Sequence, residues 1–273
     1  MLIFLYLFIC GLIGGFTAGL IGIGGGIVYI VVVPLALRYF GVPENEIVQY
    51  TVANSIFAIL FAAASANLEL IKLKLFHTKE VLVIGASSVV ASLLTLHFIV
   101  HTSWYSIRFF NFIIIFLLGY MIIATLRSAK QVLIFPLDSL KSWRLNLVGV
   151  AGGSIAALSG LGGGIVIIPI LNAIMKIEIK KASSISSGVI MITAFVMTVY
   201  SLFKQPLHTM HIYSVGYVVF PIALTLASGV IIASPYGVKT ARKLSSLTIS
   251  YIYASFLFMV IIKKIIELII VKS

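Results

Sequence analysis

The sequence predicts an all-α protein that crosses a membrane several times, and three observations support this fold class. The 273 residues are 61% hydrophobic and 10% charged, with a mean hydropathy of +1.20, whereas soluble domains carry about 25% charged residues. Apolar stretches of about 20 residues, long enough to span a lipid core, recur along the whole chain. The basic residues lie between these stretches, where they set orientation and meet anionic lipid.

This distribution of charge also limits the partners that we expect. The formal net charge is +12, but the basic residues lie singly or in short clusters beside apolar segments. This is typical of a multi-pass protein of the cell (cytoplasmic) membrane that contacts lipid, and it argues against binding to nucleic acid. The sequence does not determine the oligomeric state, and a homo-oligomer is left open.

Eight apolar segments are predicted, in two sets of four. Their residue ranges are 2–37, 47–71, 81–100 and 104–126, followed by 142–175, 183–203, 212–233 and 246–270. The longest polar stretch, 127–141, lies between the two sets. We therefore predict a first transmembrane repeat in residues 1–130, a linker in 131–141 and a second repeat in 142–273, within one integral membrane domain.

A glycine cluster that occurs twice is the main evidence for the repeat. Gly24-Gly25-Gly26 lies in the first segment, and Gly162-Gly163-Gly164 follows 138 positions later. The flanking pair Gly14-Gly15 has a counterpart in Gly152-Gly153. A duplicated glycine break in a membrane chain indicates the central site of a transporter.

The first segment of each set is too long for a single crossing. Segment 2–37 would extend about 54 Å as one helix, against a lipid core of about 30 Å. It is either one broken, tilted crossing or a hairpin whose arms meet at the glycines. The hairpin places six Lys and Arg residues on the N-terminal side and thirteen on the other, a bias that the alternative lacks. The positive-inside rule therefore favours hairpins and two inverted repeats, with both termini outside.

The chemistry expected at the glycines is anion binding. Each cluster would begin a helix, whose first N–H groups are unpaired and carry a partial positive charge. Close helix packing is the alternative reading of glycine in membranes. The duplication favours the binding site, since a small-polar run follows each copy, with Asn54 and Ser55 after the first and Ser186 and Ser187 after the second.

The apolar segments carry no charged residue near their middle, and this limits the kinds of site that they can form. No Asp, Glu, Lys or Arg lies in the middle of an apolar segment, which argues against a proton relay or an oxygen-rich cation cage. We expect no metal and no cofactor. The sequence contains no nucleophile elbow, no HExxH and no Walker loop, so an enzyme is not expected.

These residues resemble a known family. The stretch 14–26, its copy at 152–164 and the small-polar runs are similar to the TauE/SafE family of sulfite and organosulfonate exporters, also called the toluene-sulfonate uptake permease family. The resemblance covers nearly the whole chain and implies a carrier of small sulfur-containing anions or carboxylates. Family members typically have Ala-Thr-Ser and Gly-Thr-Ser where this chain has Ala53-Asn54-Ser55 and Ser184-Ile185-Ser186.

The sequence therefore predicts a secondary transporter that exports small sulfur-containing anions, such as sulfite or organosulfonates, by alternating access around a site near the membrane midplane. A passive anion channel and an accessory scaffold protein are the alternatives. The predicted substrate-binding residues are Gly24, Gly25, Gly26, Asn54, Ser55, Gly162, Gly163, Gly164, Ser186 and Ser187.

Overall fold

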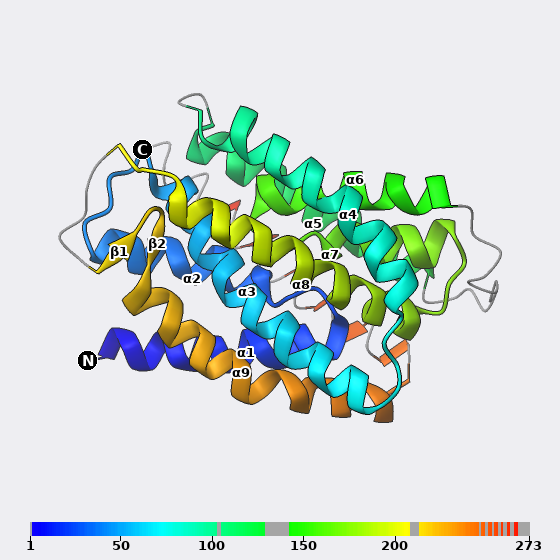
Figure 1. Cartoon of the computed structure of the whole chain (residues 1–273). Helices are drawn as coiled ribbons and strands as arrows, with labels where there is room; N and C mark the ends of the chain where they lie inside the picture. The colour runs from blue at the N-terminus through cyan, green and yellow to red at the C-terminus, as the bar shows by residue number, and fades with distance from the viewer. Residues whose placement is uncertain are drawn as a thin grey trace.

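The computed structural model is a bundle of long helices with one small hairpin of strands (Figure 1). It describes residues 2–102, 105–128, 142–207 and 213–245, together with isolated positions between 247 and 266. Within these residues, five helices are long and apolar enough to cross a membrane. The expected all-α multi-pass membrane fold is confirmed. The predicted linker and most of the last predicted segment lie outside the described residues.

The elements of the N-terminal part follow the predicted segments closely. They are helices α1 (Leu2–Ile21), α2 (Gly26–Tyr39), α3 (Ile47–Lys72), α4 (Thr78–Thr95) and α5 (Ile107–Ser128), with the π-helical turn η1 (Leu96–Val100) extending α4.

The C-terminal part has a partly similar order, but its π-helical turn follows a short helix, and it has an added strand hairpin. It contains α6 (Ser142–Ser159), α7 (Gly164–Pro169), the π-helical turn η3 (Ile170–Ile174), α8 (Ile179–Phe203), strands β1 (Ser214–Val215) and β2 (Val218–Val219), and α9 (Phe220–Lys243). The addition is the antiparallel β1–β2 hairpin, which occupies residues that the apolar pattern assigned to the seventh segment. Gly216, at φ +56°, provides its turn, and α9 therefore begins later than predicted.

Both long first segments are hairpins. In Figure 1, α1 runs away from the N-terminus and α2 returns beside it. The reversal brings Gly25 against Gly14. The two are so close that a Cβ atom on Gly25 would collide with the carbonyl oxygen of Gly14. Gly163 has the same relation to Gly152. The repeated flanking glycines therefore serve the close approach of two hairpin arms, which no larger residue permits.

The two halves of the molecule exchange helices. Helix α1 packs along α9, and α6 packs along α4. Glycines spaced four residues apart form the contact surface in each case. A Cβ atom added to Gly11, Gly15 or Gly19 would clash with α9, and one added to Gly149 or Gly153 would clash with α4. Without a hydrophobic drive between helices in lipid, such small-residue stripes stabilise association by letting backbones approach closely.

The direction of the helices bears on the inverted repeat. In Figure 1, α1 and α6 run in opposite directions, and so do α3 and α8. The two hairpins also bend at glycines 138 residues apart. The common origin of the two halves stays a prediction, and this geometry supports it.

Basic residues collect at the end of the bundle opposite the N-terminus, which is the right-hand end in Figure 1. Of the described side chains, ten Lys and Arg residues lie toward that end, and Arg38, Arg108 and Lys204 lie toward the other. The ten are Lys72, Lys74, Lys79, Arg144, Lys176, Lys180, Lys181, Lys239, Arg242 and Lys243. The positive-inside rule assigns the richer end to the cytoplasm.

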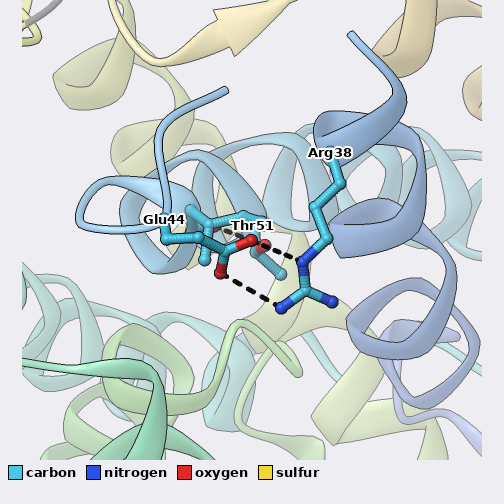
Figure 2. Close-up of polar contacts among 4 residues, drawn as sticks. Arg38, Glu44 and Thr51 are labelled. Carbon is cyan, nitrogen blue, oxygen red and sulfur yellow. Dashed lines mark hydrogen bonds and ion pairs between the residues drawn. The ribbon is translucent and has the colours of Figure 1, made fainter. Parts of the chain in front are cut away.

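The connection between α2 and α3 lies at the opposite, outer end. The guanidinium of Arg38 donates two hydrogen bonds to the carboxylate of Glu44, with N···O distances of 2.7 and 3.2 Å, and Thr51 donates to the carbonyl of Ile47 at the start of α3 (Figure 2). Both charged side chains of the ion pair are exposed, so this pair fixes the shape of the loop and adds little stability.

The packing of α1 on α9 gives a first testable prediction. A Cβ atom on Gly15 would lie 2.7 Å from the Cα of Val230, a backbone atom that cannot move aside. Gly15→Ala should therefore lower the midpoint of thermal unfolding of the detergent-solubilised protein, with a loss of about 1–3 kcal/mol. Gly119→Ala is the control, since nothing lies within 4 Å of its added methyl group. Equal stability of the two variants would contradict the packing role.

Candidate substrate-binding site

Each glycine cluster forms a break between two helices. Gly22, Gly24 and Gly25 have φ angles of 79°, 80° and 71°, and Gly160, Gly162 and Gly163 have φ angles of 65°, 83° and 76°. Only glycine adopts these left-handed angles without strain. Gly25 and Gly163 are the N-caps from which α2 and α7 begin. The expectation that each cluster opens a new helix is confirmed.

The two breaks meet level with the middle of two long apolar helices, α3 and α8. A Cβ atom on Gly24 would lie 2.8 Å from Ile59 and 3.5 Å from Ile190, and one on Gly162 would lie 3.1 and 3.3 Å from the same two side chains. Ile59 is the thirteenth of the 26 residues of α3, and Ile190 is the twelfth of the 25 residues of α8. The glycines therefore lie level with the centres of two membrane-crossing helices.

The backbones of the breaks also contact each other directly. A Cβ atom on Gly26 would lie 2.7 Å from the Cα of Leu161, and one on Gly164 would lie 2.9 Å from the Cα of Ile23. Ile23 and Leu161 are almost fully buried. The space between the triplets is thus filled in this conformation, and a solute between them requires the two halves to move apart.

At the breaks, the carbonyls of Gly22, Gly25 and Gly163 accept hydrogen bonds, but the N–H groups of the two triplets differ. Among the backbone hydrogen bonds of the described residues outside the helices and strands, none is donated by the triplets Gly24–Gly26 or Gly162–Gly164. The first N–H groups of a helix carry its partial positive charge. Because lipid cannot hydrogen-bond to these groups, they are suited to an anion.

Of the three predicted serines, Ser186 contacts a glycine break directly. The hydroxyl of Ser186 donates to the carbonyl of Gly22 at 3.0 Å, so α8 of the second half supports the break of the first half. Ser55 is fully buried, and its hydroxyl has no hydrogen-bond partner. Ser187 lines a cavity on the cytoplasmic side. Ser183, one turn earlier on α8, donates to the carbonyl of Ile21 at 2.8 Å.

The side chain of Asn54 hydrogen-bonds to the β1–β2 hairpin instead of to the glycine breaks. Its amide nitrogen donates to the carbonyls of Tyr50 and Tyr217 at 2.7 and 3.0 Å, and its amide oxygen accepts from the N–H of Val219 at 2.9 Å. The side chain therefore holds the β1–β2 hairpin over the outer end of α3. The structure does not bring its polar atoms to the glycines.

A cavity of about 70 Å³ lies on the cytoplasmic side of the first break. Gly22 is at its inner end, and three serines of α8 form a polar wall, with Ser183, Ser184 and Ser187 all lining the space. Most of the other lining residues are apolar, and two cations, Lys180 and Arg242, complete the lining.

Sequence reasoning missed several residues that the structure places here. Ile59 and Ile190 both pack against Gly24 and Gly162. Their offset of 131 is the offset of Ser55 and Ser186, and this repeat in the sequence could have identified them. Tyr29 is fully buried beside Gly14 and Gly25, and its hydroxyl has no hydrogen-bond partner. Lys180 gave no sequence signal, because its proximity to the break depends on how α8 packs.

Comparison with known proteins identifies the family. The sequence model of the sulfite exporter TauE/SafE family matches residues 7–264. The chain belongs to this family. A probable membrane transporter protein of Methanocaldococcus jannaschii is 33% identical over 245 residues, covering 88% of this chain and 86% of the relative.

Two bacterial relatives extend the comparison. A probable membrane transporter protein of Haemophilus influenzae is 27% identical, covering 95% of this chain and 98% of its own. One of Bacillus subtilis is 25% identical, covering 90% and 91%. The family that the sequence resembles is thereby confirmed. Together with the five apolar spans of the described residues, it makes this protein a multi-pass membrane transporter.

The contacts of Asn54 give a second prediction. In Asn54→Ala, the carbonyl of Tyr217 and the N–H of Val219 lose a buried partner, at a cost of roughly 1–3 kcal/mol. Hydrogen exchange at Val219 should become faster, because the hairpin is released from α3. Asn172→Ala is the matched control, since its amide bonds the carbonyl of Ile177 at the cytoplasmic end. Unchanged protection of Val219 in Asn54→Ala would refute the anchoring role.

Proposed function

We propose that the protein is a secondary transporter that exports small sulfur-containing anions, such as sulfite or organosulfonates, from the cytoplasm. The observation that carries the proposal is the meeting of two broken helices at the centre of the membrane, each beginning with glycine N–H groups that have no partner. Two helix N-termini directed to one region attract negative charge.

The surrounding electrostatics favour the same class of solute. All the Asp and Glu side chains of the described residues lie near helix ends or in loops, so no fixed negative charge opposes an anion at the centre. The hydroxyl of Ser55 is an uncommitted neutral donor, whereas that of Ser186 donates to the carbonyl of Gly22 in this conformation. A site without carboxylates can release its anion as well as bind it, which a carrier requires.

The contacts between the halves support alternating access. The buried side chains of Ile59 and Ile190 close the centre, while a cavity reaches Gly22 from the cytoplasmic side. The exchanged packing of α1 on α9 and of α6 on α4 allows one unit to move against the other around the breaks. Loading from the cytoplasmic side fits export.

Flux through the purified protein tests the proposal. Proteoliposomes containing the chain alone should transport sulfite or an organosulfonate in preference to sulfate and small carboxylates. Accumulation against the anion gradient, driven by a second ion, supports a carrier. Flux that only dissipates the gradient indicates a channel, and no flux with any of these anions favours a scaffold protein.

Ser55→Ala is the sharpest variant for the site itself. Its hydroxyl is buried without a partner, so its removal should leave thermal stability unchanged or raise it. If the hydroxyl binds the anion during transport, the KM for flux should rise about three- to tenfold, as expected for one hydrogen bond of about 1 kcal/mol.

Ser228→Ala is the control for this measurement, because that hydroxyl is exposed and bonds its own helix. Unchanged flux in Ser55→Ala would exclude this serine from the site. Substitution of Gly25 or Gly163 is less selective, since a side chain there clashes with the paired hairpin arm and affects folding as well as transport.

A further inference from the structure

The cavity on the cytoplasmic side differs in chemistry from the glycine breaks. The breaks present backbone groups, whereas the cavity presents side chains from four helices, α1, α3, α8 and α9, and from the loop after α3. Its inner end is Gly22, whose backbone lies against Ser183. The cavity therefore leads from the cytoplasm to the first break.

Two cations of this cavity have no ion-pair partner. Lys180 and Arg242 are exposed, and no carboxylate lies within ion-pair distance of either among the described residues. Among the described residues, the hydrogen-bond partner of the Lys180 ammonium is the carbonyl of Arg242, at 3.5 Å. Lys239, by contrast, lies 3.9 Å from the carboxylate of Glu69. The positive charge of Lys180 and Arg242 is thus available to a solute.

The walls of the cavity are mostly apolar. Nine of the sixteen lining residues are Ala, Val, Leu or Ile, namely Ala18, Leu20, Ile21, Ala66, Leu70, Leu75, Ile179, Val238 and Ala241. A fully hydrated inorganic anion gains nothing from such walls, whereas a short hydrocarbon group does. The free space of about 70 Å³ compares with roughly 10–15 Å³ for one water molecule, so only a small molecule fits.

We propose that this cavity is the cytoplasmic access site of the transport pathway, and that it binds a small amphiphilic organic anion. The anionic head group lies between Lys180, Arg242 and the hydroxyl of Ser187, and its short alkyl group lies on the apolar wall. This inference rests on the proposed function, and it adds the residues that recruit the substrate and a preference for organic over inorganic anions.

Neighbouring lysines provide matched charge controls. Lys181 and Lys243 are exposed cations at the same helix ends, adjacent in sequence to Lys180 and Arg242, but they do not line the cavity. Lys180→Gln and Arg242→Gln should each raise the KM for flux from the cytoplasmic face about three- to tenfold at low salt, with kcat little changed. Lys181→Gln and Lys243→Gln should have less than a twofold effect.

Equal effects of the lining and control variants would overturn the proposal, because they would show only the general surface charge. Salt provides a second readout, since screening should reduce the difference between wild type and the lining variants. A difference that does not shrink at high salt would contradict electrostatic recruitment.

Direct binding tests the organic character of the ligand. Calorimetric titration of the detergent-solubilised protein should show the weakest affinity for sulfite and the strongest for propanesulfonate. Between methanesulfonate and propanesulfonate, the affinity should rise about two- to fourfold for each of the two added methylene groups. Ala241→Leu should weaken propanesulfonate more than methanesulfonate, because it fills part of the apolar wall. Equal affinity for all three anions would overturn the amphiphilic site.

The two proposals can fail separately. If the wild-type protein transports sulfonates but the lining variants behave as their controls, the access site is wrong and the transporter stands. If no anion is transported, while propanesulfonate still binds and Lys180→Gln weakens that binding, the binding site stands and the proposed export is wrong.

Discussion

A polypeptide that reverses direction inside a membrane must manage backbone groups that lipid cannot hydrogen-bond. This constraint governs the architecture. Each reversal uses three glycines at left-handed angles, and each places its turn against the opposite half of the molecule. The carbonyl of Gly22, for example, receives the hydroxyl of Ser186 from the second half. Neither hairpin is therefore a self-contained unit, and the two halves depend on each other at the centre.

The same constraint explains why the centre is neutral and small. Backbones that approach this closely exclude side chains, and the neighbouring positions carry Ser, Gly and Ile. The described charged side chains lie near the helix ends and in the loops, where water can solvate them. The result is a partial positive charge at the midplane, made only of oriented peptide dipoles, and full positive charges at the cytoplasmic end.

The structure combines a closed centre with a cavity that is open at the end of the bundle rich in basic residues. Ile23, Leu161, Ile59 and Ile190 fill the region between the breaks, and their near-complete burial leaves no passage. On the outer side, the β1–β2 hairpin is fastened to α3 by Asn54. Access from the outside therefore requires separation of these contacts, whereas access from the cytoplasm as far as Gly22 already exists.

Much of this arrangement could be predicted from residue patterns. The apolar segments gave most helices to within a few residues, and the charge bias favoured the hairpins that the structure contains. The seventh segment was less accurate, because Val215, Val218 and Val219 are apolar but form strands beside a glycine turn. Hydropathy alone does not distinguish a short buried hairpin from the start of a helix.

The sequence by itself determined the membrane fold class, the duplicated glycine breaks and the family, since these depend on local composition and spacing. Only the tertiary structure decided that the two breaks touch, that Asn54 holds a hairpin and that Lys180 shares a cavity with Gly22. These relations join residues far apart in the chain, such as Asn54 and Val219 at a separation of 165. They arise from helix packing, in which a side chain's partner depends on the rotation and crossing of two helices that neither segment encodes alone.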